Sequence, residues 1–327
     1  QNPDVLYAAW KNPWASDTTP KVGRGTPPYG RTDWEIYSVD DQFASLAVHP
    51  ANGDPIFGAG MSLGVFKGVY DSKAGDYAWA QINNGINAVI VYDVAIDPSD
   101  ATHFLAGTLL GLYEKKGTGS WARLLSDDTR SLEFHPSDSQ TFYAGLKLPY
   151  LAKTVDGGLT WSYTNVGGEV NDIAIDTSST DTIFIAADKP GQILKSTDGG
   201  ATFATVLGGV NQSGEEYDFN VVAIDPNDPK HVFAGGGNFY SPWDLGDLWE
   251  SKDGGVNWSR TGLKNVIVNA LLIDPRDSAV MYAGCGDGFG ADVPIYKSTD
   301  GGKEWVPSYE GIPGLVKGLN DVWGSSG

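Results

Sequence analysis

Short apolar runs bounded by turn residues recur along this chain, and no stretch shows the period of about 3.6 residues expected of a helix. In each repeat a first run leads through a turn, often Asp-Pro or His-Pro, to a second run such as HFLAG or VMYAG. Runs of about four to eight residues rich in β-branched and aromatic side chains predict strands, and the proline fixes the turn between them. The first runs are FASLAVHP (43–50), VYDVAIDP (91–98), RSLEFHP (130–136), VNDIAID (170–176), NVVAIDP (220–226) and VNALLIDP (268–275).

A nearly constant octet follows a third run in four of the repeats. It reads TVDGGLTW from Thr154, STDGGATF from Ser196, SKDGGVNW from Ser251 and STDGGKEW from Ser298. Its hydroxyl and carboxylate groups can hydrogen-bond to turn backbone, and its paired glycines tolerate positive φ, so it predicts a hairpin that leads into a fourth strand. Units of four antiparallel strands, repeated about every 40 to 50 residues, are typical of propeller blades.

The octet resembles the Asp-box, or bacterial neuraminidase repeat, which reads Ser/Thr-x-Asp-x-Gly-x-x-Trp/Phe. Two other repeats carry degenerate copies: SKAGDYAW has Ala74 in place of the aspartate, and EKKGTGSW keeps little besides Trp121. Because these repeats would have lost a metal ligand or catalytic group while keeping the hairpin, we interpret the octets as structural; they also lack the ligand set of a calcium loop. The residues given this structural role are Thr154, Asp156, Gly158, Trp161, Ser196, Asp198, Gly200, Phe203, Ser251, Asp253, Gly255, Trp258, Ser298, Asp300, Gly302 and Trp305.

The two ends of the chain are predicted to complete a ring. NPDVLYAAW near the N-terminus aligns with a second run, and GLVKGLNDVW near the C-terminus aligns with a first run. We therefore expect an all-β fold, a seven-bladed β-propeller of four-stranded antiparallel blades whose ring is closed by N- and C-terminal strands in one blade, which removes exposed sheet edges. The single domain spans 1–327, with blades at about 1–40 plus 314–323, 43–82, 90–125, 130–165, 170–206, 219–262 and 268–310.

Composition narrows the choice of partners and compartment. The formal net charge is −19, from 22 Lys and Arg against 41 Asp and Glu, which disfavours nucleic acid and anionic membrane surfaces. No apolar run is long enough to span a bilayer, so membrane insertion is not expected. Cys285 is the single cysteine, so no intrachain disulfide can form. The chain begins at Gln1 without signal-peptide features, which fits a mature secreted protein, extracellular or periplasmic.

Three loops between second and third runs are long, and the predicted ring closure makes them neighbours on one face: 10–34, 236–247 and 284–293. They combine aromatic rings with carboxylates, which bind neutral sugars by stacking and by hydroxyl hydrogen bonds. The alternative is that these rings pack the loops back onto the propeller rim. The candidate ligand-binding residues are Trp10, Trp14, Tyr29, Trp34, Phe239, Tyr240, Trp243, Asp244, Asp247, Asp287, Phe289 and Asp292. The link carrying Glu215, Glu216 and Tyr217 could join this rim.

The repeats are similar to those of three groups of Asp-box propellers: sialidases, xyloglucan hydrolases built from two propellers, and photosystem assembly factors. A sialidase needs an arginine triad, whereas four of the six arginines here fall on predicted strands or near the octets. For a hydrolase, Asp33 or Asp244 could pair with Asp287, because two carboxylates about 5 to 9 Å apart can cleave a glycosidic bond.

Other catalytic chemistries find little support in the sequence. All four histidines are predicted on the octet face, away from the long loops, which disfavours a His-based triad or a zinc site there. No cofactor motif follows a strand and opens a helix, so neither cofactor nor metal is expected. We therefore expect a secreted binding or interaction module that recognises a glycan or a protein partner through the long loops. Two alternatives stay open: a polysaccharide-active glycoside hydrolase, and a structural subunit of an extracellular assembly, which would include self-assembly.

Overall fold

The computed structural model describes residues 6–10, 20–25, 34–48, 55–208, 218–237, 246–286 and 295–308. Every regular element within these ranges is a β-strand, so the predicted all-β class is confirmed. No helix in this described part is long and apolar enough to cross a membrane.

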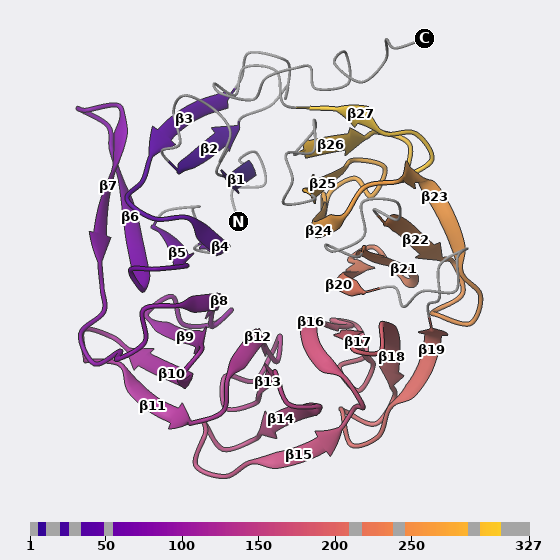
Figure 1. The fold of residues 1–327 in the computed structure, drawn as a ribbon, viewed down its shortest axis with the longest axis horizontal. Coiled ribbons are helices and arrows are strands. Elements are labelled where there is room, and N and C mark those ends of the chain that lie inside the picture. Colours follow the sequence, from indigo (N-terminus) through magenta and orange to yellow (C-terminus); the bar gives the residue numbers. More distant parts are fainter. Residues whose placement is uncertain are drawn as a thin grey trace, which may run out of the picture.

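Six four-stranded antiparallel sheets form the blades of a propeller, and the strands of each sheet pair in chain order. The predicted first runs become the first strands β4, β8, β12, β16, β20 and β24, which lie innermost around the centre (Figure 1). Blade by blade, the strands are β4 (Phe43–Val48), β5 (Ile56–Gly60), β6 (Val65–Asp71) and β7 (Asp76–Gln81); β8 (Val91–Ile96), β9 (His103–Thr108), β10 (Gly111–Lys116) and β11 (Ala122–Leu125); β12 (Thr129–Phe134), β13 (Phe142–Leu146), β14 (Tyr150–Thr154) and β15 (Ser162–Asn165); β16 (Glu169–Ile175), β17 (Ile183–Asp188), β18 (Gln192–Ser196) and β19 (Ala204–Gly208); β20 (Phe219–Asp225), β21 (Asp228–Gly236), β22 (Asp247–Ser251) and β23 (Ser259–Lys264); β24 (Val268–Ile273), β25 (Met281–Cys285), β26 (Ile295–Ser298) and β27 (Val306–Pro307).

The prediction of seven four-stranded blades is wrong, because the described residues form six. β1 (Leu6–Trp10), β2 (Lys21–Gly25) and β3 (Trp34–Ser38) form a separate sheet of three strands, all from the N-terminal part of the chain, and β1 packs against β4. The strand expected at 314–323 to close the ring lies outside the described residues. Repeat alignment could not establish this closure, because joining segments about 300 residues apart depends on long-range packing rather than on local pattern.

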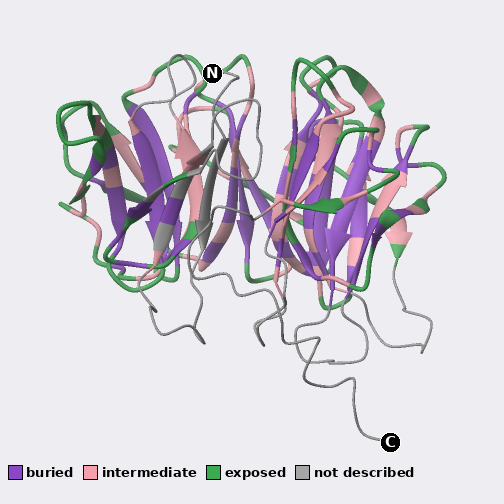
Figure 2. Cartoon of the chain, turned by 90° about the horizontal axis from the view of Figure 1, so that it is seen from above, coloured by how far each residue is buried: buried purple, intermediate pink, exposed green. Residues whose placement is uncertain are grey.

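The hydrophobic core lies between neighbouring blades. Second strands such as β13 are buried along their whole length because both faces of the sheet contact another blade. One core cluster joins Tyr143 and Leu151 of one blade to Val170 and Ile185 of the next. Figure 2 shows the same division, with buried residues in the middle of the strands and exposed residues at the turns. Since burying one large apolar side chain contributes about 1.5–3 kcal/mol, the interfaces between blades supply much of the stability.

A lysine in the third strand ties some blades to the octet of the next blade. Lys153 Nζ donates a hydrogen bond to the carbonyl oxygen of Gly199 (2.8 Å), and Lys195 Nζ donates one to that of Gly254 (2.7 Å). Each ammonium group also lies 5.3 Å from the centroid of an aromatic ring in its own blade. The octets therefore connect neighbouring blades as well as turning the chain.

The pairing of first and second strands is irregular at the same place in all six blades. Such a bulge re-aims the side chains that follow it. The register shifts lie between Phe43 and Ser45, Val91 and Asp93, Thr129 and Ser131, Val170 and Asp172, Phe219 and Val221, and Val268 and Ala270.

Candidate functional site

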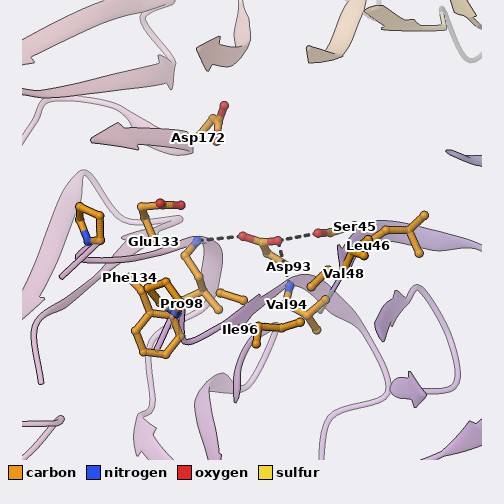
Figure 3. A pocket seen from close by; sticks show the side chains of 14 residues that line it. Ser45, Leu46, Val48, Asp93, Val94, Ile96, Pro98, Glu133, Phe134 and Asp172 are labelled. Atoms are coloured by element: carbon orange, nitrogen blue, oxygen red, sulfur yellow. Dashed lines mark hydrogen bonds between the residues drawn. The ribbon is translucent and has the colours of Figure 1, made fainter. Parts of the chain in front are cut away.

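A cavity of about 430 Å³ opens at the inner edge of the ring. Its walls come from the first strands β4, β8 and β12 and the turns that follow β8 and β12, with Asp172 added from β16. We call this space the inner cavity; Figure 3 shows its lining, in which carboxyl groups stand among aliphatic side chains.

Asp93 links three successive blades at this cavity. Its carboxylate accepts hydrogen bonds from Ser45 Oγ of the preceding inner strand (2.7 Å) and from the Leu132 N–H of the following one (2.9 Å), and also from its own neighbour Val94 (2.8 Å). Asp93 stands directly after the bulge of β8, so the irregular pairing aims it across the gaps between blades.

Asp172 and Glu133 reach the same cavity from the next two inner strands, β16 and β12. Asp172 accepts two hydrogen bonds of 2.9 Å, from the N–H groups of Ile173 and of Val222 in the following blade. The structure shows no hydrogen-bond partner for Glu133 among the residues that it describes. Each of these side chains keeps partial contact with solvent through the cavity while protein atoms surround it on its other sides.

Burial raises the pKa of all three carboxyl groups, because removal from water disfavours the charged form. The pKa is about 6 for Asp93, about 7 for Asp172 and about 8 for Glu133. This order follows the number of hydrogen-bond donors, three, two and none, since each donor stabilises the carboxylate. The negative charges of Asp172 and Asp93 raise the pKa of Glu133 further.

Glu133 is the one carboxyl group of the inner cavity that is not committed to backbone hydrogen bonds. A carboxylic acid with a pKa near neutrality can act as a general acid or base, but structural burial shifts pKa values in the same way. Sequence reasoning missed this group. The sequence does contain a signal for it, since four other blades have alanine at the inner-strand position of Glu133. These residues are Ala47, Ala95, Ala174 and Ala223.

The predicted ligand residues of the long loops are largely outside the described residues. Trp10 and Trp34 lie in β1 and β3, and their side chains are not described. Asp247 is described and buried; it forms an ion pair with Arg260 Nε (2.9 Å) and accepts a hydrogen bond from the Asn265 N–H (3.3 Å), so it is engaged within its own blade. The others lie outside the described ranges: Trp14, Tyr29, Asp33, Phe239, Tyr240, Trp243, Asp244, Asp287, Phe289 and Asp292.

A second pair of acidic residues lies at the loop ends of neighbouring blades. Asp188, at the end of β17, interacts with the side chain of Asp218, just before β20. Although burial opposes it, this interaction and Lys189, whose Nζ lies 3.1 Å from Asp188 Oδ2, lower the pKa of Asp188.

The octets hold their hairpins through hydrogen bonds between their own residues. In the copy from Ser196, the buried hydroxyl donates to Asp198 Oδ1 (2.8 Å) and accepts from the Gly200 N–H (2.9 Å). Hydrogen bonds from the side chain and N–H of Thr202 hold the pKa of Asp198 at about 2. The paired glycines have φ of 67° and 85°, a region open to glycine at little cost. The same hydroxyl-to-aspartate bond recurs at Thr154, Ser251 and Ser298.

His103 and Cys285 lie in surroundings that restrict their chemistry. His103 lies between Asp97 Oδ2 (2.8 Å from Nδ1) and Glu114 Oε1 (2.9 Å from Nε2), so both ring nitrogens are occupied. Burial raises the pKa of Cys285 to about 12, which keeps its thiol protonated at neutral pH. Within the part of the chain that the structure describes, no cluster of His, Cys, Asp and Glu could hold a metal ion.

Comparison with known proteins connects the chain to polysaccharide-active enzymes. No family model matches it. A xyloglucanase from Hypocrea jecorina (strain QM6a) is 32% identical over 103 residues, which are 28% of this chain and 12% of that protein. The structure of a GH74 enzyme from Niastella koreensis matches with a TM-score of 0.64 at 17% identity, over 82% of this chain and 45% of that one. The matches therefore span less than half the length of these relatives.

These matches confirm the resemblance to tandem-propeller xyloglucan hydrolases that the octets indicate. The fold by itself does not determine an activity. A chain from Bacteroides uniformis, whose proposed activity is that of a 6-phosphogluconolactonase, matches with a TM-score of 0.66 at 11% identity, over 94% of this chain and 96% of that one.

Proposed function

We propose that this propeller binds a neutral polysaccharide of the xyloglucan type through the face that carries the long loops between second and third strands. The local sequence match to a xyloglucanase carries the proposal, because it is a likeness in sequence as well as in fold. The net charge of −19 supports a neutral rather than an anionic polymer, since like charges repel. A polymer of this kind is met outside the cell, so we also propose that the protein is secreted.

The loop face suits a polymer better than the inner cavity does. A polysaccharide needs an open surface along which several sugar units can lie, whereas about 430 Å³ is the size of a site for one small molecule. The aromatic rings expected to stack on the sugars include Trp14 and Trp243, and the expected hydroxyl acceptors include Asp244.

Hydrolysis of the same polymer is the second candidate, favoured because the relative is named a xyloglucanase. It would pair the loop carboxylate of Asp33 or Asp244 with that of Asp287, one as general acid and the other as base or nucleophile.

Electrophoresis in gels that contain xyloglucan tests binding, with polygalacturonate as the anionic control. We expect retardation by xyloglucan alone, and about tenfold weaker binding for Trp243→Ala, equivalent to about 1.4 kcal/mol. Tyr163→Ala, which removes an exposed ring from the outer strand β15, is the matched control and should bind like the wild type. Equal mobility with and without xyloglucan would refute the proposal. Release of reducing sugar that Asp287→Asn abolishes would support hydrolysis, and no release would leave binding alone.

A further inference from the structure

The inner cavity collects three carboxyl groups, and none of the described residues that line it carries a basic side chain. Glu133 receives the charges of Asp93 from β8 on one side and of Asp172 from β16 on the other. From β4 the cavity receives the hydroxyl of Ser45, and on β13 the register partner of Glu133 is Tyr143. Full ionisation would therefore bring like charges together in a poorly solvated space.

The base on the same strand does not neutralise this group. Arg130, at the start of β12, forms an ion pair with Asp128 (Nε to Oδ1, 2.9 Å) and stacks on the ring of Tyr92 at 4.0 Å from its centroid. The charge of Arg130 is therefore engaged at the end of the strand, and among the described residues no base is left to neutralise the cavity, so its carboxyl groups are neutralised by protons.

We propose that the carboxyl groups of Asp93, Glu133 and Asp172 form a proton-dependent lock on the inner ring, which holds the propeller most firmly in an acidic medium and loosens it as the cavity ionises. The three groups belong to successive blades, so their repulsion acts between β8, β12 and β16. The inference does not depend on the polysaccharide-binding proposal.

The direction in which stability changes with pH follows from the linkage between proton binding and folding. In the unfolded chain these groups titrate near 3.8 to 4.5, whereas burial raises the folded pKa values to about 6, 7 and 8. Their stabilisation is therefore complete below about pH 4 and is lost as the pH rises to about 8. Each group that is protonated only in the folded state raises the unfolding equilibrium constant about tenfold per pH unit across this window.

The effect of His103 must be separated from that of the lock. The pKa of His103 is raised by its hydrogen bonds to Glu114 and Asp97, against the opposing effect of burial, and its contribution changes mainly above pH 6.5. His103 does not line the inner cavity, so a substitution of Glu133 leaves its contacts in place.

The test compares wild type with Glu133→Gln by urea unfolding, followed by tryptophan fluorescence, at pH values from about 5 to 8. Glutamine keeps the shape and cannot ionise. We expect the ratio of the two unfolding constants to change about tenfold or more between pH 5.5 and 7.5, with the variant the more stable at high pH. Glu304→Gln, at an exposed octet position, is the matched control and should follow the wild type at every pH. A ratio that does not change with pH would overturn the proposal.

A second measurement needs no variant. Calorimetric unfolding in two buffers of different ionisation enthalpy counts the protons exchanged on unfolding. At pH 5.5 the wild type should release between about two and three protons, because the cavity carboxyl groups are largely protonated when folded and ionised when unfolded. No release, or an uptake of protons, would contradict the lock whether or not Glu133→Gln folds.

Discussion

The hydroxyl of Ser196 is expected to support the propeller although it lies in a hairpin at the end of a blade. It is buried, donates to Asp198 Oδ1 (2.8 Å), and accepts from the N–H groups of Gly200 (2.9 Å) and Asp198 (3.2 Å). Ser196→Ala leaves the buried Gly200 N–H without its acceptor, which costs about 1–3 kcal/mol. The longer bond from Asp198 adds less. The variant should therefore lose about 2 kcal/mol of the free energy of unfolding.

The degenerate octet provides a matched control for this change. Ser72 occupies the same first position but is exposed, and the structure shows no hydrogen bond from its hydroxyl among the described residues. The carboxylate of Asp71 holds that turn instead, accepting from the Lys73 N–H (2.9 Å). Ser72→Ala should change the free energy of unfolding by less than about 0.5 kcal/mol. Urea midpoints of the two variants decide the matter: equal effects, or a negligible loss for Ser196→Ala, would refute the structural interpretation of the octet.

Three further outcomes follow from described contacts. Lys195→Met keeps the apolar stem but removes the hydrogen bond to Gly254, so it should lower the free energy of unfolding by about 1 kcal/mol in the same urea titration; an unchanged midpoint would contradict a link between blades. The pKa of His103 is raised by its carboxylate partners although burial opposes this, so its stabilisation is present below pH 6.5 and lost as the pH rises further; His103→Gln should flatten the melting temperature above that pH, and an unaltered profile would disprove this. Burial raises the pKa of the Cys285 thiol to about 12, so a disulfide reagent at pH 8 should modify it only after unfolding in guanidinium; rapid labelling of the folded protein would count against this.

The strands and hairpins could be predicted from the sequence because their determinants are local. Each octet contains its own donors, acceptors and glycines, and each first run ends in its own turn, so a window of about 40 residues holds the information for one blade. The ring closure has no such local determinant. The pairing of the N-terminal strands with a C-terminal one rests on similarity alone, and among the described residues these N-terminal strands form a sheet of three strands.

The inner cavity could not be predicted by considering one strand at a time. Asp93 and Asp172 look like ordinary polar positions of half-exposed strands, and only the arrangement of successive blades brings them beside Glu133. Sequence reasoning favours carboxylates in long loops instead, because variable loops are the usual binding regions. Those loop residues remain predictions, whereas the described carboxyl groups with the largest upward pKa shifts lie on inner strands.

Carboxyl groups in two opposite environments limit the stability of this protein, one set at low pH and the other at high pH. In the octets, hydrogen bonds from the residue four positions later hold the pKa of Asp156, Asp198 and Asp253 at about 2, so their stabilisation is present above about pH 4 and is lost as the pH falls towards 2. The inner cavity loses its stabilisation in the other direction, from about pH 4 up to 8. The melting temperature should therefore pass through a maximum near about pH 4 to 5. Asp198→Asn should flatten the acid limb alone and Glu133→Gln the alkaline limb alone, because the two groups lie in separate parts of the blades. A melting temperature that is highest at neutral pH would contradict this reasoning. So would a single variant that alters both the acid and the alkaline limb of the profile, because the charges would then act through the overall electrostatic field of the protein rather than through these two local environments.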